Sequence, residues 1–165
     1  MLSFTPSEEQ QMLVNTLHKF AETEMRAHAH ESDESGEVPS SLVNTGWEMG
    51  LIPAGIPEEY GGFGEDYSIL TGVLALEELA WGDLSIALHI LTPALFATPV
   101  LLQGTEEQKQ EYLPRFCEES FYPATAAFVE PLFQFDPYAM QTTATREGDA
   151  YILTGTKAYV PLADQ

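Results

Sequence analysis

A chain of 165 residues, 44% of them hydrophobic and 11% aromatic, is long enough for one substantial core or for a helical domain and the start of a second, which excludes disorder over the whole chain. Its six Lys and Arg residues face 26 Asp and Glu residues, and the formal net charge of −20 repels nucleic acid and anionic membrane surfaces. We therefore exclude both as partners and interpret the charge as a solubility or salt-adaptation trait, with a cationic partner chain as the alternative.

The single cysteine, Cys117, excludes an internal disulfide framework and fits a reducing compartment. No basic segment followed by an apolar run and a small-residue cleavage site opens the chain, so a secretory signal is not expected. From these two features we expect a cytoplasmic protein.

The first predicted helix begins within Thr5–Glu8, where Thr5 can act as the cap and Glu8 can complete a capping box. Apolar residues then recur at helical spacing, at Leu13, Leu17, Phe20 and Met25. The helical pattern fades in the acidic, turn-rich segment 31–37.

A short second helix is predicted from Pro39 to Met49, because Gly50 is placed to end it. The segment 52–64 holds two prolines and four glycines, and we interpret it as an ordered loop. Asp66 can cap the next helix. The apolar side of that helix is predicted to consist of Ile69, Leu70, Val73, Leu76 and Ala80.

Residues 84–102 carry no Asp, Glu, Lys or Arg, and a stretch of this length approaches what spans a bilayer. Two prolines and acidic rather than basic flanks instead favour a helix that begins after Asp83, is buried on all sides, and is kinked or broken near Pro93 and Pro99. Thr105 and Gln108 can form a capping box for a last helix that is predicted to end near Cys117.

Small and β-favouring residues become frequent beyond Ser120. Four strands are predicted, at 122–129, 141–146, 150–153 and 156–160. A hairpin turn around Gly148 should join the second strand to the third. The predicted fold class is therefore α+β, with a helical domain over residues 1–120 and a partial β domain over 121–165. A sheet this small leaves an unpaired edge, and we expect another segment or chain to cover it.

No metal site, phosphate-binding loop or catalytic triad is predicted from residue spacing. His28 and His30 point apart, because residues two positions apart on a helix do not share a face. Cys117 has only Arg115 as a basic neighbour, so an unreactive thiol is favoured over a nucleophile.

The segment from Ile56 to Gly62 reads I-P-E-E-Y-G-G and is the first of three distinctive motifs. The second begins with Glu77-Glu78-Leu-Ala and continues through Asp83 to G-T-E-E-Q-K at 104–109 and Y-L-P at 112–114. These motifs resemble the acyl-CoA dehydrogenase family, which carries P-E-x-Y-G-G-x-G, E-E-L-A-x-x-D-x-S and G-T-E-E-Q-K-x-x-Y-L-P in this order. The resemblance implies a fold-shaping role for the first motif.

The third motif runs without a gap from Glu130-Pro131 through Gly148-Asp149 to Lys157. It resembles the family pattern T-E-P-x-A-G-S-D followed by A-x-x-x-G-D-x-Y-x-L-N-G-x-K-x-W-I-T. The resemblance covers nearly all of the chain and implies a helical N-terminal domain followed by the beginning of a β-barrel or β-sandwich-like middle domain. The family's C-terminal helical domain would lie beyond Gln165.

By this resemblance, the FAD-contact positions of the family are occupied by Phe128, Val129, Phe135, Tyr159 and Pro161. Backbone groups of Phe128 and Val129 would face the flavin, although Val129 replaces a threonine and its hydroxyl. Phe135 replaces a serine, and Pro161 replaces a threonine and offers neither a hydroxyl nor an N–H. Tyr159 keeps an aromatic face where the family has tryptophan.

The resemblance further implies FAD as cofactor, acyl-CoA as substrate, and α,β-dehydrogenation of the thioester with transfer of a hydride to FAD. It places the catalytic base beyond Gln165, so no catalytic residue is assigned within this chain. We expect a homo- or hetero-oligomer, or a complementary C-terminal chain. The alternative is a non-catalytic scaffold or partner subunit of a dehydrogenase assembly with a degenerate flavin site, which the changes at Val129, Phe135 and Pro161 motivate.

Overall fold

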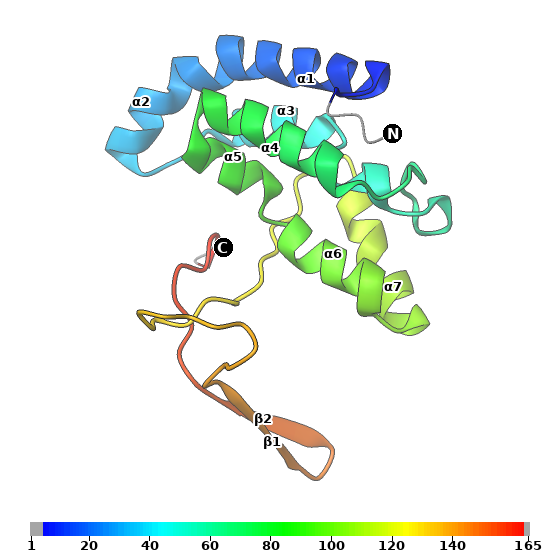
Figure 1. Ribbon diagram of the computed structural model, residues 1–165, viewed down its shortest axis with the longest axis vertical. Helices are drawn as coiled ribbons and strands as arrows, with labels where there is room; N and C mark the ends of the chain where they lie inside the picture. Colours follow the sequence, from blue (N-terminus) through cyan, green and yellow to red (C-terminus); the bar gives the residue numbers. More distant parts are fainter. Residues whose placement is uncertain (1–4, 164–165) are drawn as a thin grey trace.

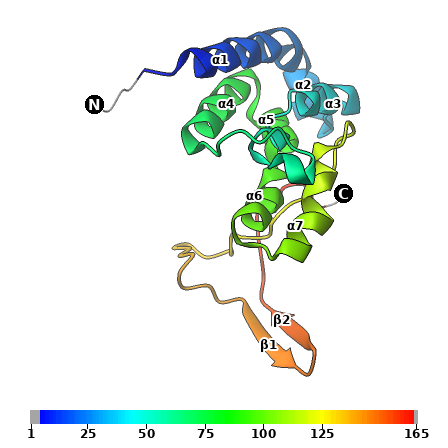
Figure 2. The same cartoon turned by 90° about the vertical axis from the view of Figure 1, so that its right-hand side faces the viewer.

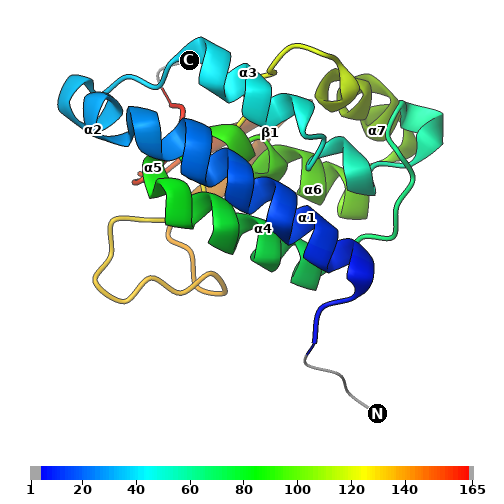
Figure 3. The ribbon, with the colours of Figure 1, turned by 90° about the horizontal axis from the view of Figure 1, so that it is seen from above.

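The computed structural model describes residues 5–163, in which helices extend up to Cys117 and one two-stranded sheet follows (Figure 1). Seen from above, α1 (Glu8–Phe20) lies along α4 (Ile69–Gly82) (Figure 3). The two strands project away from the helices (Figure 2). The α+β class predicted from the sequence is confirmed.

The cap of the first helix lies two residues later than predicted. Ser7, not Thr5, is the N-cap of α1: its hydroxyl accepts a hydrogen bond from the Gln10 N–H at 3.1 Å, and the Gln10 side chain accepts one from the Ser7 N–H at 3.0 Å. Thr5 with Glu8 and Ser7 with Gln10 both satisfy the capping-box pattern, so the local sequence does not select between them.

A π-helical turn, η1 (Ala21–Met25), joins α1 to α2 (Arg26–Ser35). The apolar spacing predicted an ordinary helix through this segment. The extra residue of the wider turn keeps both Ala21 and Met25 buried, facing Gly82 at the end of α4. The deviation therefore serves the packing of α1 against α4.

Helix α3 (Ser40–Glu48) ends within one residue of the predicted boundary, and Gly50 follows it in the left-handed conformation with φ of 71°. The predicted ordered loop is also confirmed. It contains two short 3-10 turns, η2 (Pro53–Gly55) and η3 (Glu58–Tyr60). Loop 49–68 thus reaches from α3 to α4 with little regular structure, yet with many of its backbone groups hydrogen-bonded internally.

The I-P-E-E-Y-G-G motif is tied to the helix that follows it in space, α7 (Glu106–Tyr112). The buried Tyr60 donates its hydroxyl to Glu106 Oε1 at 2.8 Å, and this hydrogen bond raises the pKa of Tyr60 to about 12. A second tie comes from Trp47, whose Nε1 donates to the Glu118 carbonyl at 2.8 Å. The Tyr60 contact holds the motif against α7, and the Trp47 contact holds the end of α3, which precedes the loop, against the chain after η4.

Helix α4 is capped by Ser68, whose hydroxyl accepts from the Thr71 N–H at 3.2 Å, and not by Asp66 as predicted. Its buried residues are Ala75 and Leu79. Most of the apolar side predicted from the sequence is exposed, namely Ile69, Leu70, Val73 and Leu76. Spacing identified an apolar stripe, but α4 packs against α1, η1 and α5 through Ala75 and Leu79, and these contacts leave most of the stripe exposed.

The uncharged stretch forms two helices, α5 (Leu84–Leu91) and α6 (Ala94–Gln103), separated by a turn at Thr92–Pro93. The predicted break at Pro93 is present, whereas Pro99 lies within α6 without ending it. The prediction of burial on all sides is wrong within this chain, since Leu84, Leu88, Leu95 and Leu102 are exposed. By length and composition, Leu84–Gln103 is the one candidate for a membrane span in the described part, and core helices of soluble proteins pass the same test.

The last predicted helix begins as predicted, but its α-helical part ends at Tyr112, five residues before the predicted end near Cys117. Thr105 and Gln108 form the capping box of α7, and a 3-10 turn, η4 (Leu113–Cys117), completes the helical part. The chain then leaves in an extended segment whose first turn is fixed by Arg115, which donates to the Tyr122 hydroxyl at 2.9 Å.

Two clusters of buried side chains form the helical core. The first lies where α1, η1, α4 and α5 meet and consists of Leu17, Phe20, Ala21, Met25, Leu42, Ala75, Leu79, Ile86, Ala87 and Ile90. The second lies among α6, η4 and the loop after α3 and consists of Trp47, Ile56, Tyr60, Ala97, Leu113 and Phe116. Together they anchor the motifs in the first 117 residues.

The sheet is a hairpin of β1 (Thr143–Glu147) and β2 (Ala150–Thr154), paired from Thr143 with Thr154 to Glu147 with Ala150. This confirms the two middle predicted strands and the turn at Gly148. The predicted strands at 122–129 and 156–160 are wrong, because these segments are extended without a ladder. β-favouring residues indicate an extended backbone, but a strand also requires a ladder of backbone hydrogen bonds to a neighbour. Among the described residues, Ala158 N–H to Val129 O is the one backbone–backbone hydrogen bond between segments 122–129 and 156–160.

The cap of α5 provides a test of the helical assignments. Asp83 accepts a hydrogen bond from the Ile86 N–H at 2.9 Å. Asp83→Ala is expected to lower the free energy of unfolding by about 1 kcal/mol, because the first turn of α5 loses its acceptor. Urea unfolding followed by circular dichroism measures this loss. Asp83→Asn, which retains the side-chain oxygen, should remain close to wild type, and an equal loss in both variants would contradict the capping role.

Candidate functional site

The two segments that carry the predicted cofactor residues lie side by side, although 27 to 29 positions separate their contacting residues. The Ala158 N–H donates to the Val129 carbonyl at 2.9 Å. Lys157 Nζ donates to the Phe128 carbonyl at 3.1 Å. Phe128, Val129 and Tyr159 therefore share one neighbourhood, and Phe135 joins it through a ring contact with Phe128.

Glu130 lies at the centre of this neighbourhood and is only 3% exposed. Its carboxylate accepts from the Thr142 hydroxyl at 2.6 Å, from the N–H groups of Gln141 and Thr142 at 2.7 and 2.8 Å, and from Lys157 Nζ at 3.1 Å. These hydrogen bonds, the Thr142 hydroxyl first among them, lower the pKa of Glu130 to about 2. Glu130 is thus ionised at neutral pH.

The side chain of Phe135 contacts one of the two cofactor segments. Its ring packs edge-on against the ring of Phe128, with centroids 5.5 Å apart and planes at 82°. Phe128 itself remains exposed on its other side. The aromatic pair thus places a phenyl ring against Phe128 at the position where the family pattern has a serine.

Tyr159 is exposed to solvent, whereas Pro161 lies at the wall of a cavity in the helical part. The side chain of Tyr159 is 89% exposed, and its backbone lies in the left-handed region with φ of 53°, which costs a non-glycine residue about 1 kcal/mol. Such conformations persist where surrounding contacts hold them, here at the Ala158–Val129 hydrogen bond. Pro161 instead lies against the helical part, at the wall of an apolar cavity.

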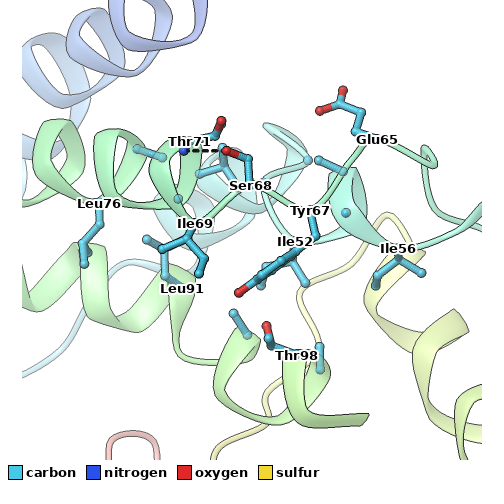
Figure 4. A pocket seen from close by; sticks show the side chains of 18 of the residues that line it. Ile52, Ile56, Glu65, Tyr67, Ser68, Ile69, Thr71, Leu76, Leu91 and Thr98 are labelled. Carbon is cyan, nitrogen blue, oxygen red and sulfur yellow. Dashed lines mark hydrogen bonds between the residues drawn. The ribbon is translucent and has the colours of Figure 1, made fainter. Parts of the chain in front are cut away.

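This apolar cavity, of about 570 Å³, opens between loop 49–68 and helices α4, α5 and α6. Figure 4 shows its centre, where Ile52, Tyr67, Ile69, Leu91 and Thr98 surround a common space while the Glu65 carboxylate points away. Sequence reasoning missed the cavity. Its signals were present as the apolar side of α4 and as the uncharged stretch after Asp83, the second of which was predicted to be buried on all sides.

The histidines and the cysteine considered in the sequence form no second site in the described residues. Among residues 5–163, no three His, Cys, Asp or Glu side chains gather as a metal ion requires. His28 Nδ1 lies 2.9 Å from the Glu24 carbonyl of its own helix, which leaves its ring tied to the backbone. Burial raises the pKa of the Cys117 thiol, in agreement with the prediction of an unreactive cysteine.

A model of the N-terminal domain of acyl-CoA dehydrogenases matches residues 7–120, more than half of the chain. The chain belongs to the acyl-CoA dehydrogenase family. The motifs of the helical part and the fold they produce therefore have a common origin with those of these dehydrogenases. The resemblance inferred from the motifs is confirmed.

Three relatives place the chain within acyl-CoA dehydrogenases. A probable medium-chain specific acyl-CoA dehydrogenase of Caenorhabditis briggsae, named as mitochondrial, is 33% identical over 96% of this chain and 38% of that protein. Butyryl-CoA dehydrogenase of Megasphaera elsdenii superposes with a TM-score of 0.76 at 31% identity, over 96% of this chain and 42% of the other. A glutaryl-CoA dehydrogenase of Mycobacterium smegmatis, solved with FADH2, gives 0.73 at 28% identity over 94% and 39%. The chain spans about two fifths of the length of these relatives.

FAD is the cofactor of this family, and the residues present fit it through backbone donors and one aromatic ring. Within residues 5–163, the N–H groups of Phe128 and Val129 have no acceptor, while their carbonyls are already bound by Lys157 and Ala158. Tyr159 follows Ala158, which hydrogen-bonds to Val129, and its ring is exposed. Phe135 and Pro161 contribute no side-chain hydrogen bond, unlike the serine and threonine of the family pattern.

Proposed function

We propose that this chain supplies the N-terminal helical domain, residues 1–120, and the first part of the middle domain, residues 121–165, of an FAD-dependent acyl-CoA dehydrogenase. The reaction would be α,β-dehydrogenation of an acyl-CoA thioester. The observation that carries the proposal is the side-by-side position of Phe128–Val129 and Tyr159, held by the Glu130–Lys157 pair with two backbone donors left open. Family membership supports the same reaction class.

The residues of this chain would act by binding and orientation. The N–H groups of Phe128 and Val129 would hold FAD by hydrogen bonds, and the Tyr159 ring would pack against it. When bound, FAD supplies the acceptor for the hydride from the substrate. The proposal assigns no catalytic base to this chain, in keeping with its motif pattern.

The apolar cavity between α4, α5 and α6 would take the alkyl part of the substrate. Its walls are mostly aliphatic, and burying an alkyl chain there is favourable by about 0.8 kcal/mol for each CH₂ group removed from water. Pro161, at the end of the cofactor segment, also lines this cavity. The cofactor segment and the acyl cavity would therefore adjoin.

A non-catalytic scaffold or partner subunit is the second candidate function. Two observations favour it: Phe135 packs on Phe128 where the family pattern has a smaller serine, and Pro161 brings no hydrogen-bond donor. Exposed apolar side chains on α4, α5 and α6 fit either candidate, since both require a homo- or hetero-oligomer or a complementary chain to cover them. We propose a reducing, cytoplasmic location on the basis of the free Cys117.

The two candidates differ in whether the protein holds flavin. The purified protein is mixed with FAD, freed of unbound cofactor by gel filtration, and examined by visible absorption. Stoichiometric oxidised flavin in the protein peak is expected, and it would rule out the scaffold function. A colourless protein that takes up no added FAD would reject flavin binding by this chain.

The contribution of Tyr159 can be measured by titration of FAD. Tyr159→Ala is expected to weaken FAD binding about 2- to 12-fold, because loss of aromatic packing costs about 0.5–1.5 kcal/mol. Tyr138, which is 96% exposed, provides the matched control, and Tyr138→Ala should leave the affinity unchanged. Equal affinities in both variants would show that the Tyr159 ring does not contact the cofactor.

A further inference from the structure

Glu130 is a buried carboxylate in a part of the chain that has almost no apolar core. All ten residues of β1 and β2 are exposed, and of the residues from Ser120 to Ala163 only Glu130 is fully buried. Hydrophobic burial therefore cannot be what holds this region together. Four hydrogen bonds to one carboxylate take its place.

Three separate segments converge on this carboxylate. Glu130 belongs to the first, Gln141 and Thr142 to the second, and Lys157 to the third. The second and third must approach closely, because a Cβ at Gly155 would lie 2.8 Å from the Cα of Thr142 and closer still to its hydroxyl. Glycine at 155 thus allows Lys157 to reach Glu130.

Lys157 links Glu130 to the segment that carries Phe128 and Val129, because its ammonium group donates to both. Its ammonium group lies 3.1 Å from Glu130 Oε1 and 3.1 Å from the Phe128 carbonyl, with Met140 Sδ at 3.5 Å. Fixing the Phe128 carbonyl fixes the plane of the peptide that carries the Val129 N–H. The next residue, Ala158, then binds the Val129 carbonyl.

We propose that Glu130 is a positioning residue, which acts through Lys157 to set the orientation of the Phe128–Val129 backbone and of Tyr159 for a ligand. As far as the ligand is FAD, the inference rests on the proposed function. Glu130 touches no ligand itself. Its part is to hold, through Lys157, the peptide that carries the Val129 N–H, in a region that has little apolar packing.

The first test follows the Ala158 amide, whose hydrogen bond to Val129 reports the closed arrangement. Glu130→Gln is expected to accelerate hydrogen exchange at Ala158 at least tenfold, because a neutral amide cannot serve four donors at once. Glu147→Gln, which changes an exposed carboxylate in β1, is the matched control and should leave the exchange unchanged. Unchanged exchange in Glu130→Gln would overturn the proposal.

Measuring Ala158 exchange as a function of pH tests whether the negative charge of Glu130 is required, and not only a side chain of its shape. Lys157 is the charged group that faces Glu130 in the described part of the chain. Since folding lowers the Glu130 pKa from 4.5 to about 2, its stabilisation is present above pH 4.5 and is lost as the pH falls through about 2. The protection factor of Ala158 should fall in this window in wild type and in Glu147→Gln. Glu130→Gln should lack the fall, and a fall of the same size there would contradict a role for the charge.

FAD titration of the same variants separates the positioning role from the proposed function. We expect Glu130→Gln and Lys157→Met to lower FAD affinity at least tenfold, with Lys157→Arg retaining it and the unfolding midpoint of the helices unchanged. Faster Ala158 exchange in a protein that never binds FAD would reject the proposed function and keep the backbone role of Glu130. Faster exchange with unaltered FAD affinity would reject positioning toward the cofactor.

Discussion

Replacement of Phe116 by alanine is expected to lower the free energy of unfolding by about 3–5 kcal/mol. Phe116 is 0% exposed and lies at the centre of the second core cluster, with its ring 5.4 Å from that of Tyr122 and 6.0 Å from that of Phe96. The loss combines the transfer of the ring to water with the cavity left between η4 and α6. Urea unfolding monitored by far-ultraviolet circular dichroism measures it.

Phe133 provides the matched control for the same substitution. Its side chain is fully exposed, at 104% of the reference value, so Phe133→Ala should change the free energy of unfolding by no more than about 0.5 kcal/mol. A loss in Phe116→Ala as small as that of the control would mean that the second cluster is not a packed core. The position of loop 49–68 would then need another explanation.

The second large effect is expected at Gly62 of the I-P-E-E-Y-G-G motif. A Cβ there would overlap the Ile56 carbonyl oxygen and lie 2.6 Å from both the Ile56 carbonyl carbon and its Cβ. Backbone atoms cannot move aside as a flexible side chain can, so Gly62→Ala should destabilise the fold by about 1–3 kcal/mol. Chemical denaturation measures this value, and weaker protection of the Gly64 amide, which donates to the Ile56 carbonyl, should accompany it.

Gly72 allows the same substitution without a steric conflict. It lies in α4, and beyond its own helix backbone and chain neighbours no atom comes within 4 Å of the position that a Cβ would take. Gly72→Ala should therefore stabilise the protein by about 0.5–1 kcal/mol through helix propensity. Opposite signs for the two glycines would show that the motif glycine is required for close backbone approach. Equal signs would contradict that requirement.

The helical part was predictable because its signals are local. Asp83 and Thr105 cap helices through residues three positions away, and such patterns are visible in a short window of sequence. The π-helical turn at Ala21–Met25 was not, since it depends on how α4 packs against α1. The same holds for the exposed face of α4, because spacing shows that a stripe exists and not what covers it.

The candidate site was predictable only in part. Motif order placed Phe128, Val129 and Tyr159 near one another, and the Ala158–Val129 hydrogen bond brings them together. Glu130 and Lys157 match positions of the family motif, so the sequence indicated these two residues. Their contact could not be predicted, because it joins residues 27 positions apart and depends on a third segment, which contains Gln141 and Thr142. No local rule predicts where an isolated extended segment will find its partner, which is also why the outer two strands were wrong.

The open hairpin and the acidic surface together make the behaviour of this chain depend on ionic strength. Strands β1 and β2 each leave one edge of N–H and C=O groups unpaired within the described residues. In dilute salt, the charge of −20 separates two copies before such edges meet. Electrostatic repulsion reaches about 10 Å at 0.1 M salt but only about 3 Å at 1 M. Concentrated salt would therefore remove the barrier that keeps hairpins of different molecules apart.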